Sequence, residues 1–327
     1  MPFDAFLFQS FGGPNTKSDV IPFLENVTRG RNIPVERLET VAQQYYHFNG
    51  QSPINKINLG IIERLQNAFS QANIALPIYF GNRNFEPYLK DALIQMKADG
   101  RTNAISFVTS AYGSFSSCKQ YKLDIESACQ EIGGRFLAVT KIRHFYSHPG
   151  FINPLITNSV AALKKLPHPD RAQLVFTAHS IPVSMSETSP YLRQLKEAVA
   201  LVANGIKNET GVSYDYSLAF QSRSGAPGQA WLEPDISDHL KALSAKNITD
   251  ALIVPIGFIS DHLEVIYDLD ILAANTAQRL GISISRTRTS SDSPAFVQMI
   301  VELTKELINN PITYPEPDCT ATCCQSR

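Results

Sequence analysis

The sequence lacks an excess of charge of either sign. It holds 29 lysine and arginine residues against 30 aspartate and glutamate residues, and its formal net charge at pH 7 is -1. Proteins that bind nucleic acid or an anionic membrane through their overall charge usually carry a clear basic surplus. The composition therefore gives no reason to expect either partner, and we expect no nucleic acid.

Long apolar runs are also missing. The N-terminal stretch "MPFDAFLFQS" has neither the basic start nor the apolar length of a signal peptide, and no run in the sequence reaches the length that spans a bilayer. We expect a cytoplasmic protein with no transmembrane segment. A chain of 327 residues is long enough for two cores or for one large α/β unit.

Cysteine is scarce and unevenly placed. Cys118 and Cys129 lie in the body of the chain, whereas Cys319, Cys323 and Cys324 lie close to its end. In a reducing compartment this pattern indicates thiolate chemistry, or no role, before it indicates disulfides. Neither a dinucleotide-binding glycine fingerprint nor a nucleophile elbow is present, so hydride transfer and acyl transfer are not suggested.

Short apolar, β-branched runs alternate with amphipathic stretches along almost the whole chain. This alternation is typical of repeated βα units and a parallel sheet. The expected strands are residues 4–11, 75–82, 103–112 and 135–142 in the first half, and 172–179, 216–222, 251–258 and 283–287 in the second. The pattern predicts an α/β fold of two similar Rossmann-like lobes, each a four-stranded parallel sheet flanked by helices.

One segment interrupts this rhythm near the middle of the chain. In "HFYSHPGFINP", residues 144–154, Pro149 and Gly150 precede a new helical period, so we expect the hinge between the lobes nearby. The predicted parts are an N-terminal lobe, a C-terminal lobe, a helix that packs back on the first lobe, and an extended cysteine-rich tail. They comprise residues 1–147, 148–290, 291–310 and 311–327.

Binding sites in open α/β sheets lie beyond the carboxyl ends of the strands, so the residues that follow each apolar run are the first candidates. After the first strand, "SFGGP" predicts a tight turn, with Phe11 directed toward a cleft. Arg29 and Arg31, on either side of Gly30, could hold carboxylates by forked hydrogen bonds. The alternative is that both arginines belong to a solvated helix end.

The end of the third strand is rich in hydroxyl groups and aromatic rings. In "SAYGSFSSCKQY", Tyr112, Phe115 and Tyr121 are spaced so that they could line a flat apolar pocket. The alternative is an ordinary helix entry with Ser116 or Ser117 as its cap.

A histidine ends the first strand of the second half. His179 in "FTAHSIP" occupies the last position of an apolar run, before a proline. Because the ordinary pKa of histidine lies close to neutrality, this imidazole is suited to exchange protons. The alternative is a core histidine bonded to a backbone carbonyl group.

Acidic residues follow the seventh expected strand in "ISDHLEVIYDLD". Its four carboxylates are those of Asp261, Glu264, Asp268 and Asp270. Asp261 and Glu264 have the spacing of a capping box, which would explain two of the four. Asp268 falls one turn beyond Glu264, so residues 261, 264 and 268 are predicted to share one helix face. Such a set of like charges repels unless a cation or protons bind.

Taken together, these segments resemble the ferrochelatase family over about residues 4–310. The resemblance is carried by "TAHSIP" and "GFISDHLEVIYDLD", with "SFGGP", "LENVTRGR", "QSPIN" and "AFQSR". It implies an enzyme of heme biosynthesis that inserts Fe²⁺ into a porphyrin. The stretch "FLENVTRGRNIPVERL" and the cysteine-bearing tail are similar to actinobacterial members, which implies coproporphyrin III as the porphyrin and coproheme as the product.

The resemblance also implies roles for individual residues. His179 matches the histidine that takes pyrrole protons or binds the metal, Glu264 matches its acidic partner, and Asp268 extends the metal or proton path. Residues implied near the porphyrin are Phe11, Arg29, Arg31, Ser52 and Tyr121. Where relatives continue the acidic row, this chain has Leu272, so an outer metal site is less secure.

The cysteines match members of the family that carry a [2Fe-2S] cluster. Cys319, Cys323 and Cys324 are one thiolate short of a four-cysteine site, and Cys118 matches the internal ligand of those relatives. Cys129 is expected in a helix as a small core residue. The alternative is a tail whose thiols bind nothing.

The sequence therefore predicts a monomeric ferrochelatase whose partners are a porphyrin, Fe²⁺ and downstream heme-pathway enzymes. Two other functions fit parts of the pattern. A tetrapyrrole or metal carrier would use the same pocket without chemistry. A cobalt chelatase acting on a sirohydrochlorin-like ring usually has more histidines at its metal site than the single match at His179.

Overall fold

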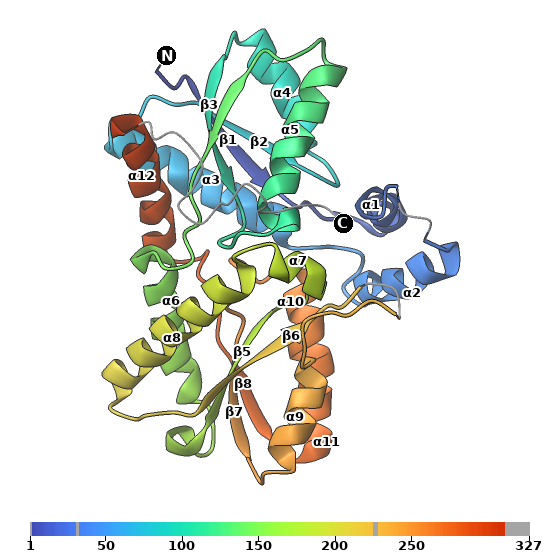
Figure 1. The fold of residues 1–327 in the computed structure, drawn as a ribbon, viewed down its shortest axis with the longest axis vertical. Helices are drawn as coiled ribbons and strands as arrows, with labels where there is room; N and C mark the ends of the chain where they lie inside the picture. The colour runs from blue at the N-terminus through green and yellow to red at the C-terminus, as the bar shows by residue number, and fades with distance from the viewer. Residues whose placement is uncertain (1, 31–32, 225–227, 311–327) are drawn as a thin grey trace. The chain divides into compact units, whose positions relative to one another are not determined.

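The computed structural model describes residues 2–30, 33–224 and 228–310, and within them the chain forms two compact units (Figure 1). Of the described residues, the first unit comprises those up to Thr109, Cys118–Arg143 and residues 300–310; the second comprises Ser110–Ser117 and His144–Met299. The chain thus passes between the units more than once, and the predicted boundary at residues 147 and 148 stays a prediction.

The first unit contains a parallel sheet in the order β2-β1-β3-β4. Its strands are β1 (Ala5–Ser10), β2 (Ile78–Asn82), β3 (Asn103–Val108) and β4 (Ala138–Lys141). Side chains of β1 alternate between two buried faces. Leu7 packs with residues of α4 and α5, whereas the ring of Phe6 lies 5.2 Å from that of Phe69 in α3.

The second unit repeats this topology with the order β6-β5-β7-β8. Its strands are β5 (Gln173–His179), β6 (Tyr216–Gln221), β7 (Asp250–Val254) and β8 (Ser283–Arg286). Val175 and Ile253 pack with Leu240 of α9 and Ala277 of α11, while α6 and α8 pack against each other and contact the strands. All eight strands predicted from the sequence are present, each shorter than predicted.

Helices fill the connections, as the alternating pattern predicts. The longer helices are α1 (Val20–Val27), α2 (Val35–Tyr46), α3 (Ile54–Gln71), α4 (Leu89–Ala98), α5 (Gln120–Glu131), α6 (Pro149–Leu163), α8 (Tyr191–Thr210), α9 (Ile236–Ser244), α11 (Ala274–Leu280) and α12 (Pro294–Asn309). The shorter ones are η1 (Lys17–Asp19), η2 (Phe115–Lys119), η3 (Pro169–Arg171), α7 (Val183–Glu187), α10 (Leu263–Val265) and η4 (Ile266–Ala273). Among the described residues, no helix combines the length and the apolar character needed to cross a membrane.

The proline and glycine at residues 149 and 150 begin a helix instead of preceding it. Pro149 is the first residue of α6, where its missing N–H costs nothing, and the side chain of His148 accepts a hydrogen bond from the backbone of Gly150 at 3.1 Å. A β-carbon on Gly150 would lie 2.5 Å from the carbonyl oxygen of Ala295, so glycine allows the start of α12 to approach α6.

Candidate functional site

His179 ends β5, as predicted, and its ring is held in one orientation. Its Nδ1 lies 2.5 Å from the carbonyl oxygen of Ser180, and because a carbonyl can only accept, Nδ1 carries the proton. The hydroxyl of Tyr191 donates to the carbonyl oxygen of His179 itself at 2.9 Å. In the neutral ring, Nε2 therefore presents a lone pair, the form in which histidine accepts a proton or binds a metal.

Glu264 meets His179 at that nitrogen. Its Oε1 lies 3.2 Å from Nε2, and both side chains remain about one-third exposed, at 36% for His179 and 37% for Glu264. The contact is close without being an aligned hydrogen bond, since Oε1 has no hydrogen-bond partner. A lone pair and a carboxylate facing each other repel, and a cation between the two groups would relieve that repulsion.

A glycine lets the chain after β7 approach His179. The backbone N–H of Gly257 donates to the carbonyl of Thr177 at 3.0 Å, and a β-carbon on Gly257 would lie 2.5 Å from the Cβ of Ala178. Any side chain at this position would push the two segments apart. Glycine here allows the segment that carries Glu264 to pass directly over the end of β5.

The capping box predicted for Asp261 and Glu264 is wrong. Helix α10 begins at Leu263, and His262 is its N-cap, with a ring nitrogen that accepts a hydrogen bond from the backbone of Val265 at 3.4 Å. The imidazole takes this position because Asp261 is engaged elsewhere, by Arg286 at the end of β8.

The four carboxylates of the segment divide into two pairs. Arg286 donates from Nε and Nη2 to both oxygens of Asp270, at 2.6 and 2.9 Å, and from Nη1 to Asp261 at 2.7 Å. A fork of this kind neutralises both acids and fixes the ends of the segment. The prediction that residue 261 shares a helix face with 264 and 268 is therefore also wrong. Glu264 and Asp268 are left as the pair near His179.

Asp268 lies in the π-helix η4 and holds its proton to near neutrality. Burial, and after it the negative charge of Glu264, raises the pKa of Asp268 to about 7. The hydroxyl of Ser222 donates to its Oδ2, and Nε2 of Gln221 lies 3.5 Å from the same oxygen. The mutual repulsion predicted for Glu264 and Asp268 is thus present.

Four residues around this site were missed from the sequence. Gln221 ends β6 and Ser222 directly follows it, Arg286 ends β8, and Tyr191 begins α8. The motif "AFQSR" and the rule that sites lie beyond strand ends would have identified the first three. Tyr191 carried no such signal, because its hydrogen bond depends on where α8 starts; its pKa is raised by burial and by the charge of Glu264.

In the first unit, an arginine that the sequence analysis did not single out links two predicted porphyrin residues. Arg83 follows β2, and its guanidinium lies 4.9 Å from the centre of the Tyr121 ring and 6.0 Å from that of Phe11. Its Nε donates to Asp124 at 2.5 Å. Phe11 is 37% exposed, whereas Tyr121 is buried, and burial raises the pKa of its hydroxyl. The strand-end rule applied to residues 75–82 would have found Arg83.

Ser52 lies against the glycine turn that follows β1. Its backbone N–H donates to the carbonyl of Pro14 at 2.9 Å, and a β-carbon on Gly13 would lie 2.7 Å from its Cβ. Thus "SFGGP" and "QSPIN" form one packed corner. Arg29 is exposed and donates to the side chain of Asn26 at 2.7 Å, and Arg31 lies outside the described residues.

Tyr112 does not line an open pocket. Only 1% of its surface is exposed, and its hydroxyl donates to the carbonyl of Ile256 at 2.8 Å, so it is a core residue of the second unit. The predicted serine cap is also displaced. The hydroxyl of Ser114 accepts from the backbone N–H of Ser117 at 3.2 Å, so Ser114 takes the place expected for Ser116 or Ser117.

The described cysteines differ in environment. Cys118 is partly exposed in η2, whereas Cys129 is buried in α5 and its pKa is raised by burial. Cys319, Cys323 and Cys324 lie outside the described residues. Within the part of the chain that is described, no three His, Cys, Asp or Glu side chains converge as a metal-binding group.

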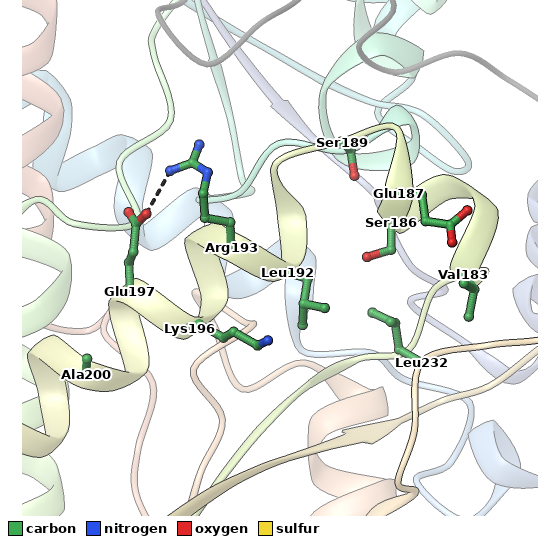
Figure 2. A pocket seen from close by; sticks show the side chains of 10 residues that line it. All are labelled: Val183, Ser186, Glu187, Ser189, Leu192, Arg193, Lys196, Glu197, Ala200 and Leu232. Atoms are coloured by element: carbon green, nitrogen blue, oxygen red, sulfur yellow. Dashed lines mark hydrogen bonds and ion pairs between the residues drawn. The ribbon is translucent and has the colours of Figure 1, made fainter.

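The second unit also has an open surface depression of about 810 Å³. It lies along α7 and the start of α8, with Leu232 opposite Leu192, and Figure 2 shows the ion pair between Arg193 and Glu197 beside it. None of the predicted site residues lines this depression. It is therefore separate from the His179 and Glu264 pair.

Comparison with known proteins gives consistent matches over most of the chain. The family model described as Ferrochelatase matches residues 4–308. The coproporphyrin III ferrochelatases of Streptomyces coelicolor and Nocardia farcinica are 42% and 45% identical to it, over 93% and 94% of this chain and 85% and 88% of theirs. The ferrochelatase of Rhodopirellula baltica is 45% identical over 93% of this chain and 86% of its own.

Solved structures support the fold. SirB from Bacillus subtilis with Fe³⁺ matches with a TM-score of 0.54 and 12% identity, over 94% of this chain and 97% of SirB. The sirohydrochlorin chelatase SirB in complex with cobalt matches with a TM-score of 0.51 and the same identity and coverage. At this identity the likeness concerns the fold alone, and it confirms the predicted pair of parallel sheets in a chelatase-like arrangement. With the family match over residues 4–308 and more than 40% identity to these relatives, the chain belongs to the ferrochelatase family.

Proposed function

We propose that this protein inserts Fe²⁺ into coproporphyrin III and yields coproheme for heme biosynthesis. The observation that carries the proposal is the pair formed by His179 and Glu264, in which a ring nitrogen with a free lone pair lies 3.2 Å from a carboxylate oxygen. Metal insertion requires a group that accepts protons and a group that attracts a cation, because the porphyrin must lose its pyrrole protons while a dication arrives. The names of the Streptomyces and Nocardia relatives support coproporphyrin III as the ring.

The proposed path for protons begins at His179. Its Nε2 takes a pyrrole proton, and the adjacent carboxylate of Glu264 stabilises the imidazolium that forms. Asp268, whose pKa is raised to about 7 by burial and by the charge of Glu264, can then bind and release a proton near neutral pH. The three groups thus provide a relay that works without a strong acid or base.

The same groups are proposed to guide the metal substrate. An imidazole nitrogen and carboxylate oxygens suit Fe²⁺, so we assign the entering ion to His179, Glu264 and Asp268. Leu272, which is 42% exposed in η4, has no ligand atom to extend this path. We therefore propose that the path ends at Asp268 and has no outer metal site at residue 272.

The first unit is proposed to bind the ring and its carboxylates. Phe11 offers an exposed aromatic ring, and Arg29, Arg31, Ser52 and Tyr121 offer donors to carboxylates. Support comes from the packed corner of Ser52, from the exposure of Arg29, and from the position of Arg83 over the rings of Phe11 and Tyr121.

Anaerobic incubation with Fe²⁺ and each porphyrin in turn tests the function. We expect the absorption spectrum to change to that of the iron complex, faster with coproporphyrin III than with protoporphyrin IX. A carrier would bind the porphyrin with no iron-dependent change above the uncatalysed rate, and that result would contradict the proposal. Faster turnover of protoporphyrin IX would contradict the choice of ring.

We also propose a [2Fe-2S] cluster held by Cys118, Cys319, Cys323 and Cys324. The described cysteines fit this assignment, because Cys118 is partly exposed while burial raises the pKa of Cys129 and disfavours its thiolate. When bound, the cluster would tie the tail to the first unit. Cys118→Ser should abolish its visible absorption, and Cys129→Ser should leave the absorption unchanged; the reverse result would assign the fourth ligand to Cys129.

The protein is further proposed to act as a cytoplasmic monomer that passes coproheme to a later enzyme of the heme pathway. The support is its near-zero net charge and the absence of a long apolar run in the sequence. Sedimentation velocity of the purified protein measures its oligomeric state, and a dimer at micromolar concentration would contradict the proposed monomer.

A further inference from the structure

The backbone at Ser222 is unusual for its position. Among the described residues, four that are not glycine have a positive φ: Asn49 at 54°, Asn73 at 57°, Asn247 at 60° and Ser222 at 64°. The three asparagines lie just after the ends of α2, α3 and α9, where a left-handed residue commonly ends a helix. Ser222 instead directly follows strand β6.

Serine tolerates the left-handed backbone conformation less well than asparagine does. The left-handed region is unfavourable for a residue with a β-carbon, and asparagine is the side chain that most often tolerates it. A strained residue of this kind persists where the surrounding structure fixes it, and such residues gather at functional sites. The contact that Ser222 makes is therefore the place to look for a reason.

That contact is with Asp268. The Ser222 hydroxyl donates to Oδ2 of Asp268, and Nε2 of Gln221 lies 3.5 Å from the same oxygen. Both donors come from the end of β6 and both use Oδ2, so Oδ1 is left for other partners. Glu264 and His179 both act electrostatically on this carboxyl group, which places it beside the proposed catalytic pair.

The way Asp268 is held differs from the way Asp270 is held. Arg286 fixes Asp270 with a guanidinium and cancels its charge. Ser222 and Gln221 fix Asp268 with uncharged donors, so the orientation is set while the carboxyl group keeps its own charge for a cation or a proton. A carboxylate that attracts a cation must keep its negative charge, and an uncharged donor orients it without cancelling that charge.

We propose that Ser222 is a positioning residue for iron insertion, and that its strained backbone holds a hydroxyl on Oδ2 of Asp268 so that this carboxyl group keeps one orientation beside Glu264 and His179. The inference rests on the proposed function. Ser222 acts through Asp268 and does not itself touch the metal or the ring.

Two substitutions at this position separate the hydroxyl from the backbone. Ser222→Gly removes the hydroxyl and relieves the strain, whereas Ser222→Ala removes the hydroxyl and keeps the strain. We expect the melting temperature of Ser222→Gly to equal or exceed that of the wild type, and that of Ser222→Ala to be lower. Both variants should lose about tenfold in kcat/KM for Fe²⁺, since a hydrogen bond to a carboxyl group is lost in each.

The KM for the porphyrin distinguishes positioning from general disruption. It should stay within about twofold of the wild-type value in both variants, because the ring contacts are assigned to the other unit. Asn247→Gly is the matched control: it makes the same change of a left-handed residue to glycine, after α9, and should keep wild-type kinetics.

The outcomes are distinct. Wild-type kinetics in Ser222→Gly would show that the hydroxyl is dispensable and would overturn this proposal while leaving the function intact. A rise in porphyrin KM equal to the loss for Fe²⁺ would also overturn it, because the role would then be structural. A wild-type protein that inserts no iron would refute the proposed function and this inference with it.

Discussion

The two units have the same sheet topology and carry opposite chemistry at their strand ends. Each sheet places its first strand in the second position, in the orders β2-β1-β3-β4 and β6-β5-β7-β8. At or beyond the strand ends of the second unit lie His179, Glu264 and Asp268, an imidazole and two carboxyl groups. Beyond those of the first unit lie Phe11 and Arg83, an aromatic ring and a cation.

This difference agrees with the proposed division of ring binding and metal handling between the two units. The second unit concentrates negative charge that only a proton or a metal can relieve, since Arg286 neutralises Asp261 and Asp270 and leaves the other two acids of the segment. In the first unit Asp124, whose charge acts on Tyr121, is paired with Arg83. A flat anionic ring would fit the aromatic ring and the cation of the first unit, and a dication would fit the two acids that remain in the second unit.

The largest expected effect comes from removing the base of the second unit. His179→Ala should lower kcat for iron insertion by about a thousandfold or more, because it removes the imidazole nitrogen that faces Glu264 at 3.2 Å. The affinity for porphyrin, measured by fluorescence quenching, should stay within about tenfold. Retained turnover would show that His179 has no part in the mechanism and would contradict the assignment of the chemistry to the second unit.

Exchanging single carboxylates for amides tests the division of the four acids. Glu264→Gln keeps the shape of the side chain and should lower kcat by about a hundredfold. Asp270→Asn, in the same segment but bonded to Arg286, should change kcat by less than about threefold. Steady-state assays of both variants decide the point, and equal losses would mean that the segment acts as one acidic surface.

A smaller effect is expected from a cation of the first unit. Arg29→Gln should raise the KM for coproporphyrin III by about fivefold to tenfold and leave kcat unchanged, because a carboxylate contact is lost equally from the ground state and the transition state. Protoporphyrin IX, which has fewer propionates, should be affected less. A fall in kcat alone would assign Arg29 to the chemical step.

The smallest effect concerns stability and pH. The pKa of Asp268 is about 7 in the folded protein against an ordinary value of 3.8, so the fold holds this proton more tightly than the unfolded chain does. Ionisation of Asp268 therefore costs stability as pH rises from about 4 to about 7, and the cost persists above that range. Asp268→Asn should raise the free energy of unfolding at pH 8 by about 1 kcal/mol, and the gain should vanish near pH 4.

Asp261→Asn serves as the control, because it should change the free energy of unfolding at pH 8 in the opposite direction. It removes the negative charge that pairs with Arg286 at 2.7 Å and leaves only a neutral acceptor, so it should lower stability at pH 8. Urea titrations at pH 4 and pH 8 measure both variants. Destabilisation by Asp268→Asn at pH 8 would show that the carboxylate is stabilised in the fold, contrary to the direction of its pKa.

The sheets could be predicted because buried parallel strands need continuous apolar runs. All eight runs, from residues 4–11 to 283–287, contain a strand. The start of α6 was predicted too late, because Pro149 and Gly150 were interpreted as a break between elements. At the first turn of a helix proline is compatible with the geometry, and Gly150 is needed there for packing against Ala295.

Site residues at strand ends were predictable in part. His179 and Glu264 were singled out because each lies at or after the end of an apolar run, and the structure brings them to within 3.2 Å of each other; Arg83 and Ser222 could have been singled out by the same rule. The capping role of His262 could not, since it arises when Arg286 from a distant strand engages Asp261. Sequence spacing reports which acids are near one another along the chain, and it does not report which of them a remote cation neutralises.

The sequence by itself determined the two parallel sheets, the strand ends that carry chemistry, and the segment with four acids, because hydrophobic periodicity and local spacing are properties of the chain alone. Only the tertiary structure decided which of those acids stay available. Arg286 reaches Asp261 and Asp270, Gly257 lets the segment approach β5, and Ser222 turns toward Asp268. Each of these contacts joins residues that are distant in the sequence and are brought together by packing, so local spacing cannot report them.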